Sequence, residues 1–97
     1  MLFYIGTHTY IRARMFRTEM IPILKKAFSI KILNISTYKG YDGADILKFT
    51  FTEVDSLIII RDFCKSISIK TNSKQHNRTY ELYCIFEYSD DIYHLKD

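Results

Sequence analysis

Residues 30–52, with the sequence IKILNISTYKGYDGADILKFTFT, decide the fold. Residues 30–38 are rich in β-branched and aromatic side chains, and residues 44–52 alternate polar with apolar ones, so each segment favours a strand. The residues between them, Gly40-Tyr-Asp-Gly43, are typical of a tight turn. The sequence therefore predicts a β-hairpin near the middle of the chain.

Helices are predicted on both sides of this hairpin. Before it, Thr18-Glu19-Met20-Ile21-Pro22 has the residue types of a helix start, and an apolar face follows at helical spacing: Met20, Ile23, Leu24, Ala27 and Phe28. After it, Thr52 and Asp55 have the spacing of a capping box and predict a helix over residues 53–65.

Further strands are expected at both ends of the chain. Residues 2–13 alternate and predict a first strand, residues 66–71 a short strand, residues 72–77 a polar loop and residues 79–88 a final strand. The order is β-α-β-β-α-β-β. It predicts an α+β, two-layer sandwich in which both helices cover one face of an antiparallel sheet, with a ferredoxin-like topology. Residues 1–89 then form one domain, and residues 90–97 an acidic, flexible tail.

This fold predicts which side chains form the core. Tyr4-Ile5-Gly6 and Phe49-Thr50-Phe51 resemble the two sheet motifs of RNA-recognition domains, in which exposed aromatic rings stack on bases. The alternating positions in this strand hold Lys48, Thr50 and Thr52, however, so we expect Phe49 and Phe51 to face the core. The full set expected to be buried is Phe3, Ile5, Ile23, Leu24, Phe28, Phe49, Phe51, Leu57, Ile60, Leu82, Cys84 and Phe86.

Charge is distributed unevenly along the chain. Residues 1–39 carry a net charge of +6 and residues 40–97 a net charge of −3, which together give the overall +3. Such asymmetry is typical of a positive patch that attracts an acidic partner. The residues expected to form the patch are Arg14, Arg17, Lys25 and Lys26.

Motifs for catalysis or metal binding are missing from the sequence. His8, His76 and His94 do not have metal-ligand spacing with one another or with the cysteines, so no metal and no cofactor is expected. Cys64 and Cys84 are expected to be reduced and buried, although a bridge between them is left open. No phosphate-binding loop and no nucleophile elbow is found, so the sequence favours a protein that is not an enzyme. A small nuclease or toxin is the minority alternative.

The remaining features favour a binding protein. The uncovered face of the predicted sheet is expected to contact a partner through Tyr4, His8, Tyr10, Arg12, Lys48 and Tyr83. The chain has fifteen isoleucines and one valine, a bias typical of AT-rich genes such as those of many phages. We therefore expect a small, phage-encoded inhibitor that occupies the surface of a host protein or nucleoprotein. The alternative is a nucleic-acid-binding domain that uses the basic N-terminal part.

Location and assembly follow from the same observations. Apolar runs such as Leu57–Ile60 are far too short to span a bilayer, and residues 1–5 lack the basic start of a secretory signal, so the cytoplasm is expected and a membrane partner is not. In a phage-encoded protein this is the host cytoplasm. A short edge strand invites pairing with a second copy, so a homodimer is expected, with a monomer as the alternative.

Overall fold

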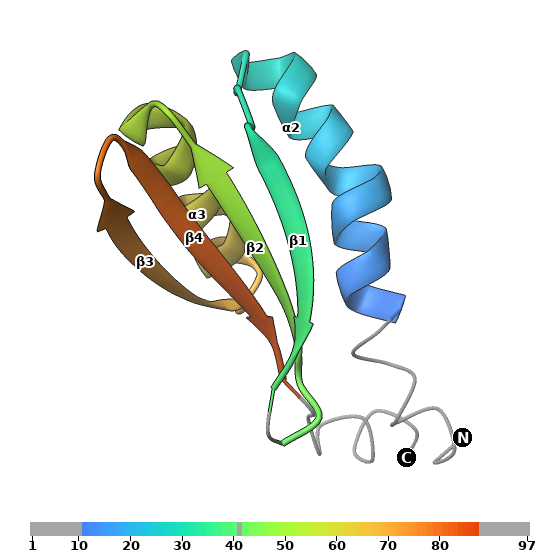
Figure 1. Ribbon diagram of the computed structural model, residues 1–97. Helices are drawn as coiled ribbons and strands as arrows, with labels where there is room; N and C mark the ends of the chain where they lie inside the picture. The colour runs from blue at the N-terminus through green and yellow to red at the C-terminus, as the bar shows by residue number, and fades with distance from the viewer. Residues whose placement is uncertain (1–10, 41, 88–97) are drawn as a thin grey trace.

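The computed structural model describes residues 11–40 and 42–87. Residues 11–28 form one continuous helix, here called the N-terminal helix, which contains the π-helical turn η2 (Phe16–Met20) and the α-helix α2 (Ile21–Phe28) (Figure 1). The hairpin β1 (Asn34–Lys39) and β2 (Asp45–Phe51), the helix α3 (Val54–Ser66) and the hairpin β3 (Lys70–His76) and β4 (Thr79–Phe86) follow. The central hairpin and the second helix are thus confirmed.

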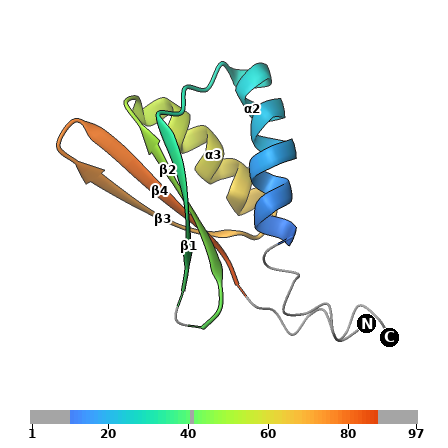
Figure 2. The same ribbon diagram turned by 45° about the vertical axis from the view of Figure 1, so that its right-hand side comes forward.

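The described strands form one antiparallel sheet in the order β1-β2-β4-β3. Both the N-terminal helix and α3 lie on the same side of this sheet (Figure 2). The α+β, two-layer arrangement is therefore confirmed. The ferredoxin-like topology is not confirmed, because β2 pairs directly with β4 and leaves no place between them for another strand. The expected strand over residues 2–13 lies largely outside the described residues, and its last three residues are helical.

The core lies between the sheet and the two helices. Along β2, and along β4 from Leu82 onward, the burial alternates, so that the side chains facing the helices are buried and their neighbours are half-buried. Phe49 and Phe51 have no exposed surface, which confirms the predicted facing and contradicts base stacking by these rings. The other described core positions predicted correctly are Leu24, Leu57, Ile60, Leu82, Cys84 and Phe86.

The N-terminal helix differs from the prediction in its buried face. The backbone N–H of Ile21 donates to the carbonyl oxygen of Phe16, five residues earlier, which defines the π turn. In a regular α-helix a spacing of five residues would rotate these two side chains apart by roughly 140°. The π turn instead places both on the core side, where they are 3% and 2% exposed. The buried face of the N-terminal helix therefore consists of Ala13, Phe16, Ile21 and Leu24.

Two core predictions on this helix are wrong, each for its own reason. Ile23 points into solvent with 60% of its surface exposed, because the π turn shifts the buried face away from it. Phe28 is 55% exposed, because it occupies the last helical position before Ser29, which adopts a left-handed conformation and ends the helix.

Two local predictions are also corrected. The capping box of Thr52 and Asp55 does not form, because Glu53 is the N-cap residue of α3 and makes no side-chain cap hydrogen bond. Residues 72–76, expected in a loop, belong to β3, an edge strand whose side chains are nearly all exposed. Such a strand is held by backbone pairing with β4 rather than by apolar contacts, so it carries no hydrophobic alternation to detect.

Candidate functional site

One face of the sheet is not covered by any helix within residues 11–40 and 42–87; we call it the open face (Figure 1). The strand register brings its side chains into rows across the sheet, because directly paired residues point to the same side. The middle row joins Ser36, Lys48, Tyr83 and Asn72. The neighbouring row joins Asn34, Thr50, Glu81 and Lys74.

A cluster of interacting polar groups occupies the centre of this face; we call it the central cluster (Lys48, Lys74, Glu81 and Tyr83). The Lys48 ammonium lies 3.2 Å from a Glu81 carboxylate oxygen, and the Tyr83 hydroxyl donates to the same carboxylate at 3.2 Å. Lys48 and Lys74 also place their ammonium groups 6.0 Å and 5.6 Å from the centre of the Tyr83 ring. Two cations and one anion thus surround a single tyrosine.

These contacts shift the acid–base properties of the cluster. The hydrogen bond from Lys48, followed by the one from Tyr83, lowers the pKa of Glu81 below its ordinary value. The same hydrogen bond with Glu81 raises the pKa of Lys48. Partial burial, with the hydrogen bond to Glu81, raises the pKa of Tyr83. All three shifts keep Lys48 and Glu81 charged and Tyr83 neutral around neutral pH, so none of these three groups is poised for proton transfer there.

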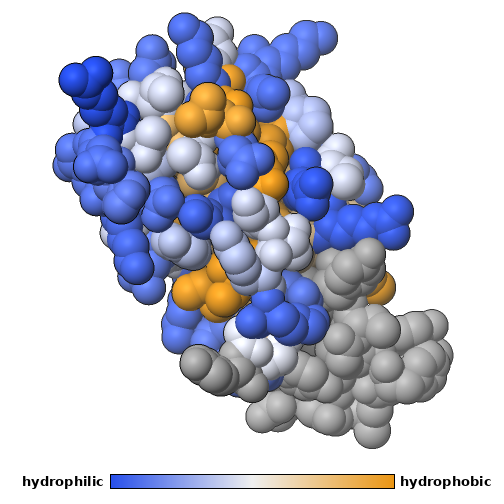
Figure 3. Space-filling model, viewed as in Figure 1, coloured by the Kyte–Doolittle hydropathy of each residue, from blue (hydrophilic) through white to orange (hydrophobic). Residues whose placement is uncertain are grey.

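The surroundings of the cluster combine apolar surface with polar atoms. Tyr38, at the sheet edge, is 46% exposed and shares this face with the half-buried Ile46 and Ile85, with which it is aligned across the strands. The space-filling view from this side shows hydrophilic side chains over the strands with hydrophobic ones between them (Figure 3). Protein–protein interfaces are enriched in tyrosine at their centre and have a polar rim, and a surface of tyrosines among paired charges has a similar composition.

The predicted partner-binding residues are only partly brought together. Lys48 and Tyr83 are neighbours on the open face, whereas Tyr4, His8 and Tyr10 lie outside the described residues. Arg12 does not belong to this surface, because it lies on the N-terminal helix with its guanidinium 5.8 Å from the centre of the Phe86 ring, on the covered side of the sheet. A prediction that placed residues 2–13 in a strand put Arg12 on the wrong element.

Two residues of the open face were missed. Tyr38 pairs with Ile46 across the hairpin, so counting the register outward from Gly40–Gly43 would have found it. Lys74 was assigned to a loop, and no sequence signal indicates its position on an edge strand.

The predicted basic patch does not form one surface with the open face. Arg14, Arg17, Lys25 and Lys26 are all exposed on the N-terminal helix, which lies behind the sheet. Arg14 and Arg17 turn toward the β1–β2 hairpin, while Lys25 and Lys26 belong to the last turn of α2. Lys48 is on the opposite side of the sheet from these residues.

The two cysteines lie together in the core. The sulfur atoms of Cys64 on α3 and Cys84 on β4 are 3.6 Å apart, both residues are fully buried, and both are free thiols. The hydrogen bond with Cys64, together with burial, raises the pKa of the Cys84 thiol far above its ordinary value. These thiols are therefore core groups rather than nucleophiles.

Within the described residues, no three or more His, Cys, Asp or Glu side chains are grouped closely enough to hold a metal ion. No helix in that part of the chain is both long and apolar enough to cross a membrane. A comparison with protein-family models, with curated proteins and with solved structures finds no match to this chain.

Proposed function

We propose that this protein is a non-enzymatic binding module whose open face docks onto the surface of another protein. The observation that carries the proposal is the central cluster, in which Tyr83 is surrounded by Lys48, Lys74 and Glu81 on a sheet face that no described helix covers. Ordered charges around an aromatic ring cost less conformational entropy on binding than mobile ones do. Such a surface is suited to recognise a partner without first rearranging.

The charge pattern favours a protein partner over nucleic acid. Glu81 places a carboxylate in the middle of the face and already pairs with Lys48, and Lys70 on the edge strand is similarly paired with Glu87 at 3.3 Å. A phosphate backbone would be repelled by these carboxylates and would find most of the lysines engaged. A protein surface of mixed charge can complement both signs.

Target and assembly stay predictions from the sequence. The expected target is a host protein or nucleoprotein, and the expected origin is a phage. An inhibitory role and a homodimer are also expected. The open face is the surface on which contact with a target or with a second copy can be tested. Binding of nucleic acid through the basic residues of the N-terminal helix is the alternative.

Site-specific photo-crosslinking tests the proposal. A benzophenone amino acid replaces the exposed Asn72, which pairs with Tyr83 on the open face; the control carries it at the exposed Lys26 on α2, behind the sheet. Irradiation in cells of the source organism should crosslink one defined protein from position 72 and not from position 26. Crosslinking from position 26 alone, or from both positions to the same protein, would move the interface away from the open face.

A further inference from the structure

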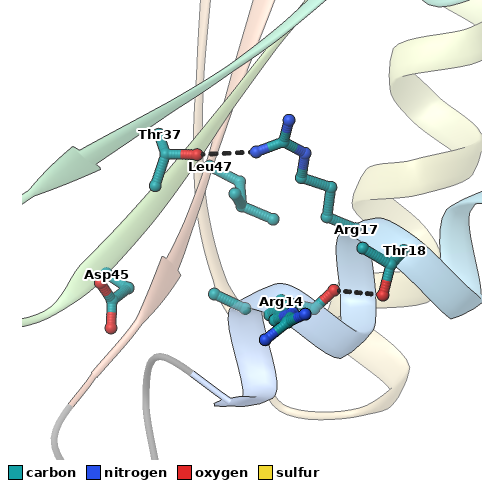
Figure 4. A pocket seen from close by; sticks show the side chains of 7 residues that line it. Arg14, Arg17, Thr18, Thr37, Asp45 and Leu47 are labelled. Atoms are coloured by element: carbon teal, nitrogen blue, oxygen red, sulfur yellow. Dashed lines mark hydrogen bonds between the residues drawn. The ribbon is translucent and has the colours of Figure 1, made fainter. Parts of the chain in front are cut away.

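A separate pocket lies on the covered side of the sheet, between the N-terminal helix and the β1–β2 hairpin (Figure 4). Its volume of about 380 Å³ falls in the range of about 300–1,000 Å³ typical of small-molecule sites. Arg14 and Arg17 line one wall, Thr37 and Asp45 line the other, and Leu47 lies between them as an apolar contact surface. The pocket is distinct from the open face, which it does not touch.

The two arginines give this pocket a positive wall. Both line the same pocket from the helix, so two like charges lie on one wall and repel each other. In the described part of the chain, neither forms an ion pair with a carboxylate. Asp45 on the opposite wall accepts a hydrogen bond from Lys39 at 2.9 Å, so its charge is balanced from outside the pocket. A bound anion would relieve the repulsion between the arginines.

Arg17 is already held in position for such an anion. Its Nη1 donates to the Thr37 hydroxyl oxygen at 3.2 Å, across the pocket. Because that hydroxyl acts as an acceptor, its own hydrogen stays available to donate to a ligand. The remaining N–H groups of Arg17, with the guanidinium of Arg14, provide planar donor sets that match the oxygen atoms of a phosphoryl group.

We propose that this pocket binds the phosphoryl group of a small phosphate monoester. Arg14 and Arg17 balance the two negative charges of the phosphoryl group, and the Thr37 hydroxyl donates a further hydrogen bond. The volume beyond the phosphoryl group accommodates a compact ester group against Leu47. The inference is independent of the proposed function, because it concerns the other side of the sheet.

An NMR titration of the ¹⁵N-labelled protein tests the site. Phenyl phosphate is added at constant ionic strength, with inorganic phosphate and chloride as parallel arms. Amide shifts are expected at residues 13–18, 37 and 45–47, with phenyl phosphate binding more tightly than inorganic phosphate and no shift with chloride. Equal affinities for ester and inorganic phosphate would overturn the monoester assignment, and equal shifts with chloride would overturn the site.

Substitutions sharpen the test. Arg14→Gln and Arg17→Gln should each weaken phenyl phosphate binding by about tenfold, the loss expected for one charge-assisted hydrogen bond. Lys25→Gln removes the same charge at the far end of the helix and should change the affinity by less than about twofold. Thr37→Val removes the hydroxyl group and should weaken phenyl phosphate binding, while Thr37→Ser keeps the hydroxyl group and should leave the affinity nearly unchanged. If Lys25→Gln weakens binding as much as Arg17→Gln, the protein attracts anions through net charge alone and the proposal fails.

Discussion

Replacing Phe16 with alanine tests how the N-terminal helix is attached to the rest of the protein. The Phe16 ring is 3% exposed and lies 6.2, 6.1 and 5.6 Å, centre to centre, from the rings of Phe49, Phe63 and Phe86. Truncation of a buried phenylalanine typically costs about 3–5 kcal/mol of unfolding free energy. That is a large part of the about 5–15 kcal/mol that stabilises a typical domain.

Urea denaturation followed by circular dichroism measures this loss. With a urea dependence of about 1.5 kcal/mol/M, the midpoint should fall by about 2–3 M. Phe28→Ala is the matched control, because simple helical spacing places Phe28 in the core whereas its position at the very end of α2, before Ser29, leaves it 55% exposed. Phe28→Ala should lower the unfolding free energy by about 1 kcal/mol or less. If Phe28→Ala costs as much as Phe16→Ala, the described helix register is wrong.

Three further predictions concern other parts of the molecule. Glu81 has a lowered pKa, so its charged form stabilises the fold fully above the ordinary carboxyl pKa of about 4.3, and this contribution disappears as pH falls through the lowered value. The stability difference between wild type and Glu81→Gln should therefore shrink on acidification in urea titrations; a difference that stays constant would refute the ion pair. Cys64 and Cys84 should resist iodoacetamide in the folded protein and react only after unfolding, as measured by mass spectrometry, whereas rapid labelling without denaturant would contradict their burial. Short DNA and RNA should give no gel shift at low salt; a shift that is abolished by charge reversal of Arg12, Arg14, Lys25 and Lys26 would instead support nucleic-acid binding.

Much of the fold could be predicted from the sequence because local patterns encode it. Alternation in residues 44–52 fixes which side of β2 faces the core, and helical spacing of Leu57, Ile60 and Cys64 fixes the buried face of α3. The hairpin follows from the turn at Gly40–Gly43, where Gly43 adopts a φ of +84° that other residues rarely accept.

The errors occur where long-range contacts override local patterns. The spacing of five between Phe16 and Ile21 fits no α-helical face, and only packing against the sheet and α3 selects the π turn. Strand β3 is polar and exposed, so the sequence of this strand contains no alternating apolar residues that would indicate its pairing with β4. The strand order depends on which hairpins pair with each other, a choice that no single segment determines.

The same limits apply to the candidate sites. Lys48 and Tyr83 could be predicted on the open face, because both lie on strands that alternate clearly. Arg12 could not be placed, because its element was misassigned. The pocket of Arg14 and Arg17 could not be predicted either, because its opposite wall comes from residues twenty or more positions away in the sequence.

The most direct test of the proposed function is the affinity of Tyr38→Ala for the protein captured by crosslinking at position 72. Tyr38 is 46% exposed on the open face, so its truncation should leave the fold intact and remove an aromatic contact from the interface. Ile23→Ala is the control, because Ile23 is 60% exposed on α2, behind the sheet. Measured by biolayer interferometry, Tyr38→Ala should raise the dissociation constant by about tenfold, mainly through faster dissociation, with Ile23→Ala unchanged. An unchanged affinity for Tyr38→Ala, or a larger loss for Ile23→Ala, would contradict binding through the open face.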